Sequence, residues 1–195
     1  MPWLPQRTPA RLATAILGAA VTCAAIASAR FASTTAEADR RVRFQTVAGL
    51  HGVFNTRIPG TATGVTANED HGRITFTAPV AQLDTGNSMR NRHLRERFKA
   101  DRYPNIVLVV ERSRLKRVED DQAVTGNVTG DFTLAGATRP VTIAYRVNRT
   151  GTDYHVHASF RVNINNFGLE TPCFAGVCVD PNVDVTIERY KLRDQ

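Results

Sequence analysis

Apolar and polar residues alternate along much of the chain, most clearly between residues 124 and 147. One side of this stretch carries Val124, Gly126, Val128, Gly130, Phe132 and Leu134, and the residues between them are Thr, Asn or Asp. After a turn at 135–140, a second alternating set follows: Val141, Ile143, Tyr145 and Val147. A period of two is typical of a β-strand with one face in water. The stretch predicts an antiparallel hairpin whose apolar face must be buried.

Similar patterns predict further strands at 42–47, 52–58, 73–80, 154–164 and 183–190. Residues 106–110 are apolar on both faces, so a strand there should be covered twice, and a helix across its outer face would explain this. The chain has no internal repeat and no alternation of strands with helices. About eight short strands with turns between them favour an antiparallel barrel or sandwich, and a closed barrel would remove both exposed edges.

One segment, residues 85–104, does not fit any strand pattern. Met89, Leu94 and Phe98 fall near one face of a helix, while arginines cover the rest of its surface. Asn87 or Ser88 can cap its start, and Pro104 prevents it from continuing. We therefore expect one amphipathic helix in an otherwise all-β domain.

The first thirty residues differ from the rest of the chain. Two arginines precede an uncharged apolar stretch, residues 12–29, which ends in the small-x-small sequence Ala27-Ser28-Ala29. This pattern predicts a secretory signal peptide at 1–29, followed by a linker at 30–41 and one domain at 42–195. The alternative is an uncleaved membrane anchor, because eighteen apolar residues approach the length of a bilayer span. We expect export to the periplasm, either free or anchored facing it.

Export would limit the partners that the positive charge of the chain can attract. Removal of the signal peptide lowers the formal net charge by two, from +7 to +5, and makes cytosolic nucleic acid an unexpected partner. Anionic lipid head groups, with transient contact at a membrane surface, and simple solubility remain as explanations. Cleavage also leaves two cysteines, Cys173 and Cys178, which most simply form a disulfide in an oxidising compartment. Free thiols are the alternative, and a zinc site lacks nearby ligands.

Four segments resemble, in order and spacing, the YceI-like family of exported polyisoprenoid-binding proteins: TGNSMRNRHL (85–94), the Tyr-Pro at 103–104, VTGDFTLAGATRPVTI (128–143) and NINNFGLETP (163–172). The resemblance spans roughly residues 42–190. It implies a lipocalin-like antiparallel β-barrel with a helix against it, whose apolar interior takes up a long isoprenoid chain. The family usually opens with an aspartate followed by a His-Ser pair, which is absent here, and the closest feature is His51-Gly52.

The resemblance turns the inward-facing residues into candidate ligand contacts. We expect the lumen to be lined by Phe76, Leu94, Phe98, Val128, Phe132, Leu134, Ile143, Tyr145, Phe160 and Val162. Without the resemblance, the same aromatic residues are ordinary core. Glycine at 126 and 130 should leave unfilled space in the wall or bend the sheet. Arg90, Arg92 and His93 are candidates for a phosphate or pyrophosphate head group, since guanidinium binds such oxygens in pairs, although a solvated helix face is the plainer interpretation.

Enzymatic function has little support in the sequence. His155 and His157 share a strand face and could contribute to a metal site, but that face is the polar one, and we assign no metal, no cofactor and no catalytic residue. The predicted function is binding or transport of a long-chain isoprenoid lipid. A cell-envelope interaction or stress-response module without a lipid is the alternative. Whether two chains associate as a homodimer is left open.

Overall fold

The computed structural model describes residues 31–32, 41–50 and 54–194, so the predicted signal peptide and most of the predicted linker lie outside it. The described chain is mostly antiparallel β with one helix, as expected. Its longer strands are β2 (Arg41–Leu50), β3 (Phe54–Ala62), β4 (Thr66–Asp70), β5 (Arg73–Pro79), β7 (Asn105–Glu111), β8 (Ala123–Leu134), β9 (Ala137–Thr150), β10 (Asp153–Asn163) and β13 (Asn182–Asp194). The short strands are β1 (Phe31–Ala32), β6 (Leu83–Asp84), β11 (Cys173–Phe174) and β12 (Val177–Val179). The helices are α1 (Ser88–Arg97) and three 3-10 turns, η2 (Val80–Gln82), η3 (Arg112–Arg114) and η4 (Ile164–Phe167).

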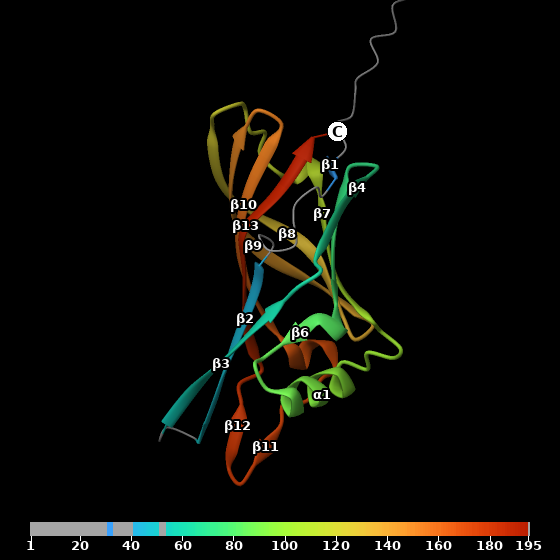
Figure 1. Ribbon diagram of the computed structural model, residues 1–195, viewed down its shortest axis with the longest axis vertical. Helices are drawn as coiled ribbons and strands as arrows, with labels where there is room; N and C mark the ends of the chain where they lie inside the picture. Colours follow the sequence, from blue (N-terminus) through green and yellow to red (C-terminus); the bar gives the residue numbers. More distant parts are fainter. Residues whose placement is uncertain (1–30, 33–40, 51–53, 195) are drawn as a thin grey trace, which may run out of the picture.

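All strands belong to one curled antiparallel sheet (Figure 1). Hydrogen bonding runs through β4, β5, β7, β8, β9, β10, β13 and β2, and β2 also pairs with β3 and β12. The two residues of β1, which lie in the predicted linker, pair with β13, and Ala32 also pairs with β4. The described residues form more strands than the eight or so expected. Four of the additional strands have only two or three residues, and β4, with the sequence TANED, is too polar to show an alternating pattern.

The hairpin at 124–147 forms with the predicted faces. Val128 lies opposite Ile143, and Gly126 lies opposite Tyr145, in β8 and β9. Its turn is shorter than the expected 135–140, since only Ala135 and Gly136 separate the strands, both with positive φ. Two successive residues with positive φ make the turn type that matches the twist of paired strands. Residues 137–140 therefore belong to β9.

The two glycines of β8 do not leave open space, contrary to the expectation from sequence. A Cβ on Gly126 would lie 2.8 Å from the hydroxyl oxygen of Tyr145, and one on Gly130 would lie 2.9 Å from the carbonyl oxygen of Val109. The Tyr145 ring fills the position that a side chain at 126 would occupy. These glycines permit close packing of neighbouring groups and do not create the lumen.

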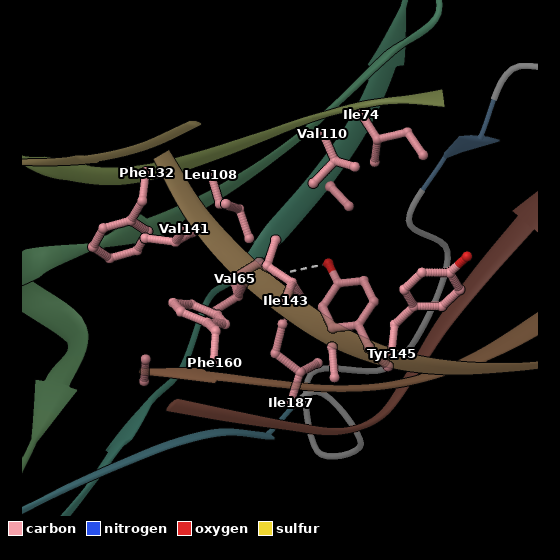
Figure 2. Packing of buried hydrophobic residues seen from close by; sticks show 14 of the residues in the cluster. Val65, Ile74, Leu108, Val110, Phe132, Val141, Ile143, Tyr145, Phe160 and Ile187 are labelled. Carbon is pink, nitrogen blue, oxygen red and sulfur yellow. Dashed lines mark hydrogen bonds between the residues drawn. The ribbon is translucent and has the colours of Figure 1, made fainter. Parts of the chain in front are cut away.

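The inner face of the sheet carries the hydrophobic core (Figure 2). Phe132 packs edge to face on Phe160 and on Phe167, with ring centroids 5.6 and 5.7 Å apart. Tyr190 is fully buried, and its hydroxyl donates to the carbonyl oxygen of Val65 at 3.1 Å. This bond ties β13 to the segment between β3 and β4, on the other side of the interior from β9. The curvature is thus held by side chains that meet across the interior.

Helix α1 lies at one end of the curled sheet, the lower end in Figure 1. The Asn87 side chain accepts a hydrogen bond from the Arg90 amide at 3.0 Å, so Asn87 is the N-cap. The helix does not cover the outer face of β7. Its Leu94 and Phe98 line the same cavity as Ile106 and Leu108, the inward-facing residues of that strand. Val107 and Val109 on the outer face are half-buried without it.

Candidate functional site

A cavity of about 320 Å³ lies between the curled sheet and α1. Its wall is almost entirely apolar. Inward-facing residues of β2, β3, β5, β7, β8, β10 and β13 form it, and the polar exceptions are Thr46, Thr85, Arg90, His93, Arg97 and Asp180. A cavity of this size falls at the low end of the range for small-molecule sites, which are concave and mostly apolar with a few polar groups. The arrangement suits an apolar ligand and offers polar contacts at one end.

The cavity opens at the end where α1 lies. Five of its lining residues are exposed to solvent, and they come from α1 or from the segments beside the β11–β12 hairpin: Arg90, His93, Arg97, Pro172 and Asp180. The remaining lining residues are buried or half-buried. We call the rim formed by these five residues the mouth. An apolar chain entering here would pass basic side chains before it reached the aromatic interior.

A second, smaller chamber of about 90 Å³ continues the interior away from the mouth. It is lined by residues of β8, β9 and β10, including Tyr145 and Tyr154, and by the segment that follows η3. Phe76, Leu108 and Ile187 line both chambers, so they form the partition between them. The Phe76 ring is braced by Tyr190, with centroids 5.7 Å apart and planes at 78°. The interior therefore consists of two mostly apolar chambers that share these three side chains.

The ten residues predicted to line the lumen divide between the chambers. Phe76, Leu94, Phe98, Phe132, Leu134, Phe160 and Val162 line the larger one, and Val128, Ile143 and Tyr145 line the smaller one together with Phe76. The prediction missed the wall contributed by β2, β3 and β13, to which Phe44, Ile58 and Val185 belong. The signal was present for Phe44, because Val42, Phe44 and Thr46 alternate along the strand predicted at 42–47 and all three line the cavity.

The three head-group candidates on α1 occupy different positions. Arg90 and His93 line the mouth, and Arg97 joins them one turn later. Arg92 is absent from the cavity wall: its side chain is 62% exposed and its guanidinium lies 4.0 Å from Glu96. Residues three, four and seven apart share one side of a helix, and position 92 lies on another side. The cavity-facing basic set is therefore Arg90, His93 and Arg97.

Local hydrogen bonds orient Arg90. Its Nη2 donates to the carbonyl oxygen of Thr85 at 2.8 Å, and its Nε donates to the Thr85 hydroxyl at 3.2 Å. Thr85 is buried, and its amide and hydroxyl both donate to Oδ1 of Asn91. Arg97 is anchored differently, by a 2.8 Å bond from Nη1 to the carbonyl oxygen of Glu170. Two guanidinium groups are thus held at the mouth by backbone carbonyl oxygens and one hydroxyl, with no carboxylate bonded to either among the bonds described.

Asp84 completes the anchor at the start of α1. Its Oδ1 accepts from the Asn91 amide at 2.8 Å and from the Gly86 amide at 2.9 Å. The bond from Asn91 and the bond from Gly86 lower the pKa of Asp84 below its ordinary value, because both stabilise the carboxylate. Residues of the motif TGNSMRNRHL are therefore joined by hydrogen bonds among themselves and to Asp84. The Thr, Asn and Arg side chains of the motif fix the helix against β6.

The other recognised segments reach the same end of the molecule. The amide of Val80 donates to the carbonyl oxygen of Pro104, and the Tyr103 ring fills the space beside Gly136 in the β8–β9 turn. The segment NINNFGLETP forms η4, whose Phe167 is buried against Phe132. All four segments thus build the end of the curled sheet that carries the mouth.

Cys173 and Cys178 form a disulfide across the β11–β12 pair, where they lie directly opposite each other. The expected bond is therefore present. It closes a hairpin whose β12 strand pairs with the end of β2.

No three His, Cys, Asp or Glu side chains gather into a metal-binding group in the described part of the chain. His157 is exposed on the outer face of β10. Within the described residues, no helix is both long and apolar enough to span a membrane.

Comparison with known proteins identifies relatives of the whole domain. A family model described as the YceI-like domain matches residues 27–189. Among curated proteins, a UPF0312 protein of Pseudomonas putida strain W619 is 27% identical over 152 residues, covering 74% of this chain and 75% of the relative. A UPF0312 protein of Pseudomonas syringae pv. tomato is 28% identical over 147 residues, covering 71% and 72%.

Solved structures show the same fold at low sequence identity. A polyisoprenoid-binding domain from Saccharophagus degradans, implicated in plant cell wall breakdown, superposes with a TM-score of 0.66 at 14% identity and covers 86% of this chain and 99% of its own. BcnA of Burkholderia cenocepacia superposes with a TM-score of 0.60 at 19% identity, covering 82% and 98%. These likenesses establish the architecture.

Proposed function

Because the chain belongs to the YceI-like domain family, we propose that it binds the apolar chain of a polyisoprenoid lipid in the cavity beneath α1 and carries it in the periplasm. The observation that supports this most is the apolar interior with two arginines and a histidine among the five residues of the mouth. A structural neighbour bearing a polyisoprenoid-binding name agrees with the proposal. The signal-peptide pattern at 1–29 supports the compartment. Binding of this kind requires no cofactor and no catalytic residue.

The size of the interior sets how much of the lipid it can hold. An engineered apolar cavity of roughly 150 Å³ accepts benzene. By that measure, the chamber of about 320 Å³ accommodates about a dozen carbon atoms. If each carbon atom is counted as one CH₂ group at ~0.8 kcal/mol, burying about twelve of them contributes about 10 kcal/mol. This is comparable to the ~4–15 kcal/mol cost of association. A longer isoprenoid must extend into the second chamber or remain partly in the mouth.

We assign the head group to the mouth. Arg90 and Arg97 present guanidinium groups there, and His93 lies between them on the same side of α1. Guanidinium groups bind phosphate oxygens with two parallel hydrogen bonds, which makes a phosphate or pyrophosphate the best-matched polar end. Arg92, a candidate from sequence, is not part of this site because it pairs with Glu96 away from the cavity. The lipid would therefore bind with its tail among the aromatic residues and its phosphate at α1.

The proposal is tested by extracting the protein, purified from its native envelope, with organic solvent and analysing the extract by mass spectrometry. We expect a polyprenyl species at close to one per chain. In the variant Ala78→Phe, a phenyl ring would occupy part of the larger chamber, because Ala78 lines it. That variant should retain at most a tenth of the lipid.

Ala144→Phe is the matched control, since Ala144 is exposed on the outer face of β9. It should carry as much lipid as the unchanged protein. Recovery of equal lipid from both variants would show that the lipid is bound elsewhere. An extract free of isoprenoids would favour an envelope interaction module without a lipid ligand.

A further inference from the structure

Large hydrophobic side chains are exposed at one end of the molecule. Among the described residues, the large hydrophobic residues exposed to solvent are Phe54, Met89 and Phe174, at 49, 59 and 86%. They belong to the start of β3, the first turn of α1 and the β11–β12 hairpin, which all lie at the mouth end (Figure 1). Single exposed apolar residues are normal, but aromatic residues gathered at one end mark an interaction surface.

The strand register places two of these residues in one row. Phe174 lies opposite Val177, Val177 lies opposite Leu50, and Leu50 lies opposite Phe54. Directly paired residues of an antiparallel sheet point to the same face. The four side chains therefore form a continuous apolar row across β11, β12, β2 and β3. We call this row the tip.

The tip continues the wall of the cavity. Side chains alternate along a strand, so Leu50 shares a face of β2 with Thr46, and Phe54 shares a face of β3 with Ile58. Thr46, Ile58 and Val179 all line the cavity, and Val179 shares its face of β12 with Val177. The sheet face that begins inside the cavity thus extends past the mouth, through Ala48 and Thr56, to the apolar row in solvent, so a lipid can follow one mostly apolar face.

The surface beside the tip is basic. Between Ser88 and Arg97, α1 carries four arginines and one glutamate. The bond from Arg97 to the carbonyl oxygen of Glu170 holds this helix next to the segment that leads into β11. An apolar row flanked by arginines is complementary to an anionic bilayer, where phosphates surround an acyl interior. A second copy of the chain is less well matched, because symmetric contact would bring two arginine-rich helices together.

We propose that the tip inserts into the surface of an anionic phospholipid bilayer, with the arginines of α1 on the lipid phosphates and the mouth of the cavity facing the membrane. This docking surface goes beyond ligand binding and does not depend on which lipid the cavity holds. In this orientation the Phe174 ring lies deepest, and Arg92, which the cavity does not use, contacts the head groups.

Co-sedimentation of the full chain with vesicles of phosphatidylglycerol and phosphatidylcholine, free of isoprenoids, tests the proposal. The double variant Phe54→Ser/Phe174→Ser should partition at least tenfold more weakly than the unchanged chain. Arg92→Glu should weaken partitioning at least threefold and Arg114→Glu should not, since Arg114 lies in η3 beside the far chamber. All chains carry the same first thirty residues, so differences between them report on the tip.

A probe at the tip separates docking from anchoring by the N-terminus. The chain has one tryptophan, Trp3, so Trp3→Phe makes a silent background. In that background, Phe174→Trp should shift its emission to the blue and be quenched by brominated lipids. Thr152→Trp, in the exposed β9–β10 turn at the other end, should do neither.

Equal quenching at both positions, or none at 174, would overturn the proposal, as would full partitioning of the double serine variant. Self-association that the same variant abolishes, measured by size-exclusion chromatography without vesicles, would replace the bilayer with a second copy. Because the vesicles lack isoprenoid, these results are independent of lipid recovery from the cavity.

Discussion

Phe76 is the residue that divides the interior. It lines both chambers, it is only half-buried, and Tyr190 supports its ring edge to face. Leu108 and Ile187 complete the partition, but both are buried in the core. An aromatic ring on the edge of a cavity can change rotamer at lower cost than a fully packed residue, because fewer contacts are lost. Phe76 is therefore the side chain that sets how far an apolar chain can penetrate.

We expect Phe76→Ala to join the two chambers. We would measure the affinity for isoprenoid alcohols by competition over a series of chain lengths. The ratio of the affinity for long members to the affinity for short members should rise at least tenfold. The substitution should also lower the free energy of unfolding by about 3 kcal/mol, near the lower end for such changes, since the ring is only half-buried. Phe44→Ala is the control because Phe44 lines only the larger chamber. If both variants shift equally, the partition plays no part in chain-length preference.

Helix α1 combines several roles within ten residues. Its start is fixed by the Asn87 cap and by Asp84, whose lowered pKa reflects the bonds it accepts from Asn91 and Gly86. One side presents Arg90, His93 and Arg97 to the mouth. Arg92 lies on another side, where it pairs with Glu96. Since neighbouring positions on a helix face different directions, the element can separate ligand contacts from bilayer contacts.

This separation predicts different effects for two arginines of the same helix. Arg97→Ala should weaken binding of a soluble short-chain polyprenyl phosphate by about tenfold or more, because a hydrogen bond to a charged group contributes about 1.5–3 kcal/mol. It should leave binding of the corresponding alcohol unchanged. Arg92→Ala should leave both unchanged. Isothermal titration calorimetry measures all four affinities. Equal losses for phosphate and alcohol in Arg97→Ala would remove the head-group assignment.

The extent of strand pairing and burial differs between the two ends of the molecule. β10 pairs with β13 along its length and with β9 over residues 153–159, β9 pairs with β8 over residues 137–148, and most of their inward residues are buried in the core. Among the described strands, the first residues of β3 pair only with β2 and are exposed, and β11 pairs only with the three-residue β12. Mouth and tip are thus built from the least supported segments, as elements that admit ligands usually are.

Hydrogen exchange should reveal this gradient. Amides in the centres of β9 and β10 should exchange at least about a hundredfold more slowly than those of Phe54–Arg57. Core strands exchange only through openings of high free energy, whereas frayed segments open at almost no cost. The measurement is exchange followed by mass spectrometry of the purified chain. Uniform protection along the whole described chain would contradict the gradient. It would indicate that the tip is held by contacts beyond the pairing described.

Much of the fold was predictable because period-two alternation is a local property. The faces of the 124–147 hairpin and the inward position of most cavity residues follow from spacing along the chain, and the helix start was narrowed to a cap at Asn87 or Ser88. The disulfide was also predictable, because the two cysteines lie five residues apart and the signal-peptide pattern led us to expect an oxidising compartment. Local patterns identify which residues face inward, since the geometry of a strand leaves only two sides.

What the interior contains depended on contacts between distant segments. Tyr145 fills the space beside Gly126, although an unfilled wall was expected, and α1 lies at the mouth although a cover for β7 was expected. The division by Phe76 and the row from Phe174 to Phe54 likewise join strands far apart in sequence. Alternation alone determined that there is an apolar inside. Only the tertiary structure decided that this inside is hollow, because a void depends on how opposite walls meet and no single strand records that distance.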